Sequence, residues 1–262
     1  MIAGQATKLG RNTHDIRYDS IHDEILVGNP IAQALLTFRG GATGDESPLR
    51  VIQGPHTQLQ LTERAEVDPI HNEIFALGNE SVLVFSRTAS GDVAPLRVIQ
   101  GPDTLLKDAR ALAGDPVHNL IIVSVNDLPR AEGEKEPQSG LVIFNRTDNG
   151  NVKPRAVIAG PNTGFALIYI HGTPFFSVNM VQTYPPRGWI VVTQSAIKPE
   201  DNFVGVWSVN DNGDVPPRWR IGGPQSTLKR VRGVALDPQH KEIFMEDVNL
   251  NAILTYSFPE FF

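Results

Sequence analysis

The stretch IQGPHT at residues 52–57 decides the fold, because related phrases recur along the whole chain. Successive copies lie about 50 to 60 residues apart, which matches or slightly exceeds the length of one β-propeller blade. A repeat of this period indicates stacked units that bury a continuous core together. The other copies are IQGPDT at 99–104, IAGPNT at 158–163, IGGP at 221–224 and a truncated IAG at 2–4.

A second phrase inside the units predicts a tight turn between two strands. An Asp, often followed by Pro, starts this turn, and a β-rich run follows it. Next come a strand such as VLVF at 82–85, a turn with SGD at 90–92 and the closing phrase PLRVI at 95–99. Because no stretch has a convincing helical period, each unit is predicted to hold four short strands. The turn phrases are DSIHDEI at 19–25, DPIHNEI at 68–74, DPVHN at 115–119 and DPQHKEI at 237–243.

The two ends of the chain predict the number of blades. The last unit stops after AILTYSF at 252–258, which corresponds to a third strand, and it lacks the fourth. Residues 1–4 match the end of the missing strand, so pairing the two ends would leave no open sheet edge. We therefore predict an all-β fold, a five-bladed β-propeller with four antiparallel strands per blade. Residues 1–262 would form a single domain, closed by the N-terminal strand in the last blade.

The quoted phrases carry a family resemblance. The DP-x-HNEI turn, the run VFSRTASGDVAPLRVIQGP at 84–102 and the Gly-Pro-x-Thr phrase resemble the NHL-type propeller repeats of bacterial proteins. Such propellers resemble, more distantly, the fold of gluconolactonase-like and strictosidine-synthase-like enzymes. NHL propellers usually have six blades, so the predicted count of five departs from that pattern. A shared fold does not carry a function with it.

Residues that every unit repeats are expected to be structural. We expect the repeated histidines and aspartates to cap the turn, and the repeated arginines to tie neighbouring blades through carboxylates or carbonyls. Polar side chains at the ends of the second strands could cap loops or hydrogen-bond an uncharged ligand. These sets are His22, His71, His118 and His240; Asp19, Asp68, Asp115 and Asp237; Arg50, Arg97, Arg155 and Arg218; and Asn29, Asn79, Asn126, Gln194 and Asp247.

Broken symmetry points to the candidate functional residues. Five positions before the turn Asp, four blades carry His14, Glu63, Arg110 and Arg232. The resemblance to gluconolactonase-like enzymes implies carboxylate or amide ligands for a divalent metal at this position. Two guanidinium groups would repel such a metal and would suit an anionic group instead. His14 and Glu63 would then be the catalytic proton-transfer pair, and Arg110 and Arg232 would bind the substrate.

A structural interpretation of the same positions competes with these functional ones. The inner strands also carry Asp15, Arg17, Arg64 and Glu66, and opposite charges in a narrow channel can form a salt-bridge network. If the channel mouth is a pocket, these four residues and His171 are candidate ligand-binding groups. Two longer loops would deepen that pocket: residues 126–139 with several acidic side chains, and the segment around the non-repeated His171.

Composition limits the classes of function. The formal net charge is −6, so nucleic-acid and membrane partners are not expected, and the absence of cysteine excludes thiolate chemistry. We expect a small-molecule hydrolase or lyase of the lactone, ester or phosphoester class, acting on a substrate with an anionic group. The alternative is a non-catalytic NHL-like scaffold that binds a protein or glycan through its loop face. A calcium-type metal is only weakly indicated. We expect a monomer, either cytoplasmic or secreted to the periplasm or beyond after loss of a signal peptide.

Overall fold

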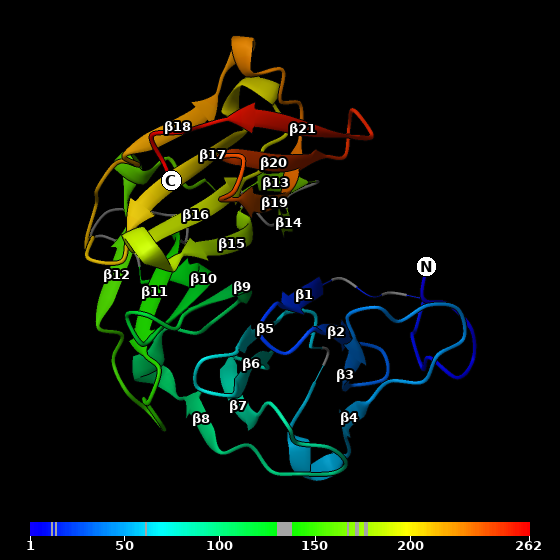
Figure 1. Cartoon of the computed structure of the whole chain (residues 1–262). Coiled ribbons are helices and arrows are strands. Elements are labelled where there is room, and N and C mark those ends of the chain that lie inside the picture. Colours follow the sequence, from blue (N-terminus) through cyan, green and yellow to red (C-terminus); the bar gives the residue numbers. More distant parts are fainter. Residues whose placement is uncertain are drawn as a thin grey trace. The chain divides into compact units, whose positions relative to one another are not determined.

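The computed structural model describes residues 1–11, 13, 15–60, 62–129, 138–166, 168–170, 173–175 and 178–262 (Figure 1). The chain divides into two compact units. The first contains Met1–Leu106 and Arg146–Lys153, and the second contains Lys107–Asn145 and Pro154–Phe262. The sequence-based expectation of one domain stays a prediction.

The first unit contains two four-stranded antiparallel sheets, each with its strands in chain order. Its core lies between these two sheets, where Leu26, Leu35 and Ile52 of the first pack with Ile74 and Leu83 of the second. The strands are β1 (Asp15–Asp19), β2 (Glu24–Asn29), β3 (Ala34–Arg39) and β4 (Arg50–Gln53), then β5 (Ala65–Asp68), β6 (Glu73–Gly78), β7 (Ser81–Ser86) and β8 (Arg97–Gln100).

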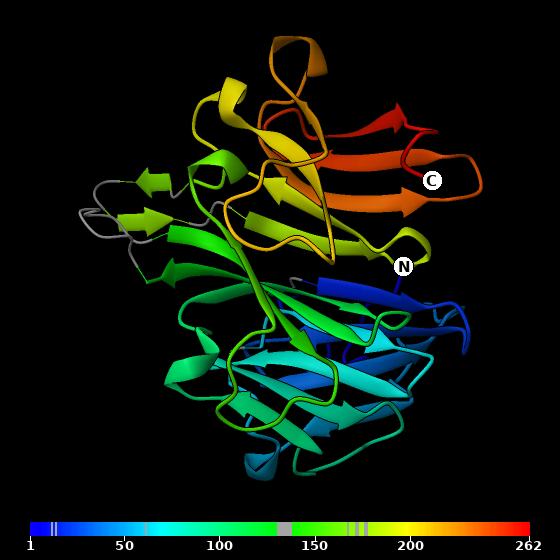
Figure 2. The ribbon, with the colours of Figure 1, turned by 90° about the vertical axis from the view of Figure 1, so that its left-hand side faces the viewer.

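The second unit contains three further antiparallel sheets and a short hairpin. Figure 2 shows the three strands of the last sheet side by side, from orange to red. The strands are β9 (Ala109–Asp115), β10 (Leu120–Leu128), β11 (Gln138–Asn145) and β12 (Ala156–Ala159); the hairpin β13 (Ile168–Ile170) and β14 (Thr173–Phe175); β15 (Val178–Tyr184), β16 (Trp189–Gln194), β17 (Phe203–Ser208) and β18 (Trp219–Gly222); and β19 (Val231–Asp237), β20 (Glu242–Asp247) and β21 (Ala252–Ser257).

The chain thus has the predicted all-β fold, a five-bladed β-propeller. Central strands such as β7 and β17 are long apolar runs, because they are covered on both faces. The last sheet differs from the prediction of four strands, since three are present in the described part of the chain. None of the described helices has the length and apolar character that a membrane crossing would need.

Five copies of one turn follow the closing phrases, and we call them the Gly-Thr turns: residues 4–8, 54–58, 101–105, 160–164 and 223–227. In the copy after β4, the Thr57 hydroxyl donates to the Gly54 carbonyl oxygen at 2.6 Å and accepts from the Leu59 amide at 3.3 Å. A side chain on Gly54, whose φ is +136°, would overlap the carboxylate of Asp92. The same hydroxyl bonds recur at Thr7, Thr104, Thr163 and Ser226.

Residues 1–4 take the position of a fourth strand that precedes the first blade. Ile2 forms a parallel bridge with Gly44, in the same manner as Ile52 with Gly91. Equivalent bridges join Ile99 to Gly150 and Ile158 to Gly213, so each covers the edge of an outer strand. The pairing of these first residues with the last blade stays a prediction.

Candidate functional site

A cluster of charged side chains lies on the inner strands of the first unit. Asp15 and Arg17 alternate along β1, so both point to the same, buried face. The Arg17 Nη1 lies 3.2 Å from the Asp15 Oδ1, and its Nε lies 3.0 Å from the Glu66 Oε2 on β5. Arg64 is close enough to Asp15 to attract its carboxylate. We call Asp15, Arg17, Arg64 and Glu66 the inner charge cluster.

Burial is the largest influence on the pKa values of Asp15, Arg17 and Glu66. It raises the pKa of the Asp15 carboxyl, although Arg17 and Arg64 act in the opposite direction. Burial likewise raises the pKa of Glu66, against the attraction of Arg17. For Arg17 burial alone would lower the pKa, but Glu66 and Asp15 raise it, so the guanidinium stays charged. The cluster therefore holds a cation between two carboxyl groups that are costly to ionise.

The arrangement leaves Arg17 engaged on both sides. Only 8% of its side chain is exposed, with Asp15 at 3% and Glu66 at 14%. A substrate anion would have to displace one of these carboxylates from a partly desolvated site. The structural alternative of the sequence analysis, an ion-pair network, therefore describes Asp15, Arg17 and Glu66 in the first unit.

The remaining described residues that were predicted to line the channel belong to different units of the chain. Glu63 directly precedes Arg64 in the first unit, and it is partly buried. Arg110 on β9 forms an ion pair with the neighbouring Asp108. Arg232 on β19 is exposed, and its backbone carbonyl accepts a hydrogen bond from the Thr193 hydroxyl at 2.8 Å. The joint use of Glu63, Arg110 and Arg232 as one pocket stays a prediction.

Several predicted site residues lie outside the described residues. These are His14, His171 and the acidic part of the long third-blade loop, residues 130–137. Among the residues that the structure describes, no group of three or more His, Asp or Glu side chains is placed to hold a metal ion. The His, Glu and two Arg at the matched positions are also a poor donor set for a divalent cation.

The repeated turn residues are structural, as predicted. In four blades the His Nδ1 lies 2.7 to 2.9 Å from the carboxylate of the Asp that starts the turn. The same Asp accepts from the backbone amide of that His. The pairs are His22 with Asp19, His71 with Asp68, His118 with Asp115, and His240 with Asp237.

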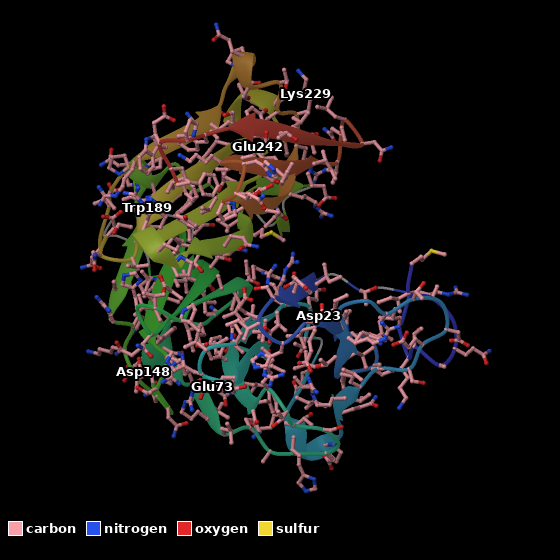
Figure 3. All side chains as sticks on the ribbon, viewed as in Figure 1. Asp23, Glu73, Asp148, Trp189, Lys229 and Glu242 are labelled. Carbon is pink, nitrogen blue, oxygen red and sulfur yellow. The ribbon has the colours of Figure 1, made fainter. Side chains whose placement is uncertain are left out.

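The repeated arginines tie blades in a way that the sequence predicted only in part. Arg50 and Arg97 bind glutamates of their own blades, Glu24 and Glu73. Arg97 also donates directly to the Arg146 carbonyl oxygen of the next segment at 3.1 Å, as predicted. A second arginine on each glutamate adds a further link: Arg87 reaches Glu24 at 2.6 Å. Arg146 reaches Glu73, labelled in Figure 3, at 2.9 Å. Arg218 pairs with Asp211 of its own blade.

The second-strand ends cap loops. The Asn29 amide donates to the Lys8 carbonyl, and Gln194 donates to the Ala166 and Ser195 carbonyls. Burial alone would raise the pKa of the Asp247 carboxyl, but the hydrogen bonds that it accepts from backbone amides, those of Lys229 and Arg230 among them, hold the pKa below its usual value. These groups are therefore occupied in holding the connections between blades.

Sequence reasoning missed a groove on the first blade. It encloses about 580 Å³ between the β2–β3 turn and the Gly-Thr turn after β4. We call it the amide groove because four glutamines line it. Its described lining residues are Ala32, Gln33, Gln53, Gly54, Pro55, Gln58, Leu59 and Gln60. The available signal was a departure from the repeat: positions 58 and 60 hold glutamine only in this copy.

Comparison with known proteins adds no relative from which a function could be transferred. No protein-family model matches the chain, and no curated protein matches it. The fold and the local geometry are therefore the grounds for a functional proposal.

Proposed function

We propose that this chain is a non-catalytic binding module, an NHL-like scaffold for a protein or glycan. The observation that carries the proposal is the pairing of its inner-strand cations. Arg17 is held between Asp15 and Glu66, and Arg110 is held by Asp108. Removing one partner of the buried Arg17 pairs is costly, because an uncompensated charge would remain in the interior. Ligand recognition would then fall to the outward-facing turns.

We also propose that the chain is related to the NHL-type repeats of bacterial proteins. The Asp–His turns and the Gly-Thr turns repeat with matching geometry, as a repeat family requires. A repeat scaffold can place different side chains at one position in successive units. Recognition then arises where one unit departs from the others.

The test is a turnover assay on the purified chain with a panel of lactones, carboxylic esters and phosphate esters. We expect hydrolysis no faster than in buffer alone, with and without added calcium. Glu63→Gln provides the matched variant, because it removes the predicted proton-transfer group while keeping the size of the side chain. Turnover that is lost in Glu63→Gln would overturn the proposal.

A second candidate is the hydrolase or lyase of the lactone, ester or phosphoester class. The observation that favours it is that burial raises the pKa of Asp15 and Glu66, since perturbed carboxyl groups cluster at catalytic sites. In that function Glu63 and His14 would transfer protons, and Arg110 and Arg232 would bind the anionic part of the substrate. The same assay decides between the two candidates.

A further inference from the structure

We propose that the amide groove on the first blade binds a neutral saccharide. The inference rests on the proposed binding function and names its site and ligand class. Gln33 comes from the β2–β3 turn, Gln53 from the end of β4, and Gln58 and Gln60 from the segment that follows. Two chain segments thus bring four primary amides to one groove.

The lining favours an uncharged ligand rich in hydroxyl groups. Each primary amide offers two N–H donors and a carbonyl acceptor, and a sugar hydroxyl likewise both donates and accepts. No charged side chain occurs among the described lining residues. Ala32, Pro55 and Leu59 add apolar surface that can contact the C–H groups of a sugar ring.

Three of the four amides are available to a ligand. Gln53 donates through Nε2 to the Ala32 carbonyl at 2.8 Å, which leaves its own carbonyl oxygen as an acceptor. Within the described part of the chain, the side chains of Gln33, Gln58 and Gln60 have no hydrogen-bond partner. All four glutamines are exposed, so water occupies these donors and acceptors until a ligand replaces it.

The backbone beneath the groove is held in place before any ligand arrives. Gln33 and Gln58 both have a left-handed conformation, with φ of 51° and 60°. The Gly-Thr turn is fixed by the Thr57 hydroxyl, and Leu59 is buried in the core of the first unit. A rigid base lowers the ordering cost of binding. The volume of about 580 Å³ lies within the range of small-ligand clefts.

Comparison of the five copies distinguishes the groove residues that serve the fold from those that are left for a ligand. The glycine, the hydroxyl residue and the apolar residue recur in the five Gly-Thr turns, so they serve the fold. The residues at the position of Gln58 are Lys8, Leu105, Gly164 and Thr227, and those at the position of Gln60 are Gly10, Lys107, Ala166 and Lys229. Leu105 has the same φ of 60° as Gln58, so this backbone accepts leucine. The two amides are thus not needed for the turn.

The experiment titrates cellotetraose, maltotetraose and mannotetraose into isotope-labelled protein and follows the side-chain amide signals by NMR. We expect the amide signals of Gln33, Gln53, Gln58 and Gln60 to shift with at least one tetrasaccharide. The variant Gln58→Leu/Gln60→Ala, built from residues of other copies, should weaken that binding about tenfold or more. Gln100→Ala, which changes the counterpart of Gln53 on the second blade, should leave it unchanged. Because no charge lines the groove, added salt should not alter the affinity.

Three outcomes would overturn the inference. They are no shift with any of the three tetrasaccharides at millimolar concentration, binding that survives in Gln58→Leu/Gln60→Ala, and shifts of these amides with a capped uncharged peptide in place of the sugars. None of these results concerns turnover. The hydrolysis assay alone overturns the binding function, so the two failures are distinguishable.

Discussion

The Gly-Thr turns after β4 and after β8 share one backbone but carry different side chains. In both turns the Thr hydroxyl donates to the Gly carbonyl oxygen at 2.6 Å, and the following residue has a φ of 60°. The first turn then presents Gln58 and Gln60, whereas the second presents Leu105 and Lys107. This difference shows that the repeat fixes the backbone with a few positions and leaves the side chains at the other positions free to vary.

The largest effect is expected where neither turn is involved, in the inner charge cluster. Arg17→Met should lower the free energy of unfolding by about 3–5 kcal/mol, because it removes the guanidinium that lies between the Asp15 and Glu66 carboxyl groups. Urea unfolding followed by circular dichroism measures this change. A loss below about 1 kcal/mol would mean that the cluster contributes no more than a surface ion pair.

The control removes all three partners together. Asp15→Asn/Arg17→Met/Glu66→Gln should restore part of the lost free energy of unfolding, since neither carboxylate that Arg17 compensates is left, whereas Arg64 keeps its charge. If the triple variant were as unstable as Arg17→Met, packing of the Arg17 stem, and not its charge, would account for the effect.

A smaller effect is expected from the shared part of the turns. Thr57→Val keeps the shape but removes the hydroxyl that bonds the Gly54 carbonyl and the Leu59 amide. We expect a loss of about 1–2 kcal/mol in the free energy of unfolding. Thr104→Val in the second turn should cost the same amount within error, because its two bonds are equivalent. Unequal losses would contradict the assignment of this residue to the scaffold.

A still smaller effect is expected from the part of the turns that differs. Gln58→Leu/Gln60→Ala should change the free energy of unfolding by less than about 0.5 kcal/mol, because both positions are exposed and the backbone already accepts these residues elsewhere. The same urea titration measures it. A larger loss would show that the amides stabilise the turn, and the comparison between the two turns would fail.

The smallest effect concerns the Asp–His turn of the last blade. The hydrogen bond that the His240 ring donates to the Asp237 carboxylate raises the pKa of His240 above 6.5, and the same bond lowers the pKa of Asp237 below 3.8. The His240 contribution to stability is complete below pH 6.5 and is lost as pH rises through the folded pKa. The Asp237 contribution is present above pH 3.8 and is lost as pH falls through its folded pKa. The pair thus stabilises most between these values.

NMR titration of the His240 ring measures this pair directly. In Asp237→Asn the pKa of His240 should return toward 6.5, because the carboxylate that raises it is gone. An unchanged pKa in that variant would assign the shift to another group, such as Glu242.

Much of the fold could be predicted from the sequence, because each blade repeats the same local solution. The same Asp–His pair occurs in the turn of four blades, so the recurrence of the histidine in the sequence was enough to predict its structural role. The partners of Arg17 could be named as a set, since the cluster contains adjacent inner-strand residues. The second arginine on each glutamate could not be predicted, because Arg87 and Glu24 meet only once two sheets pack.

The amide groove escaped prediction for a physical reason. Its residues come from two segments about twenty positions apart, and glutamine, alanine and proline are ordinary surface residues. Gln58 and Gln60 can be recognised as exceptions only when they are compared with Leu105 and Lys107 at the same backbone positions. The pairing of residues 1–4 with the last blade, and the use of Glu63, Arg110 and Arg232 in one pocket, remain predictions.

The most direct test of the central claim compares two variants in one tetrasaccharide titration. The claim is that the inner charge cluster holds the fold while the amide groove holds the ligand. Asp15→Asn/Arg17→Met/Glu66→Gln should bind the tetrasaccharide with the affinity of the unmodified chain, and in Gln58→Leu/Gln60→Ala the affinity should fall about tenfold or more. The reverse result, with binding lost in the cluster variant and kept in the groove variant, would contradict the account.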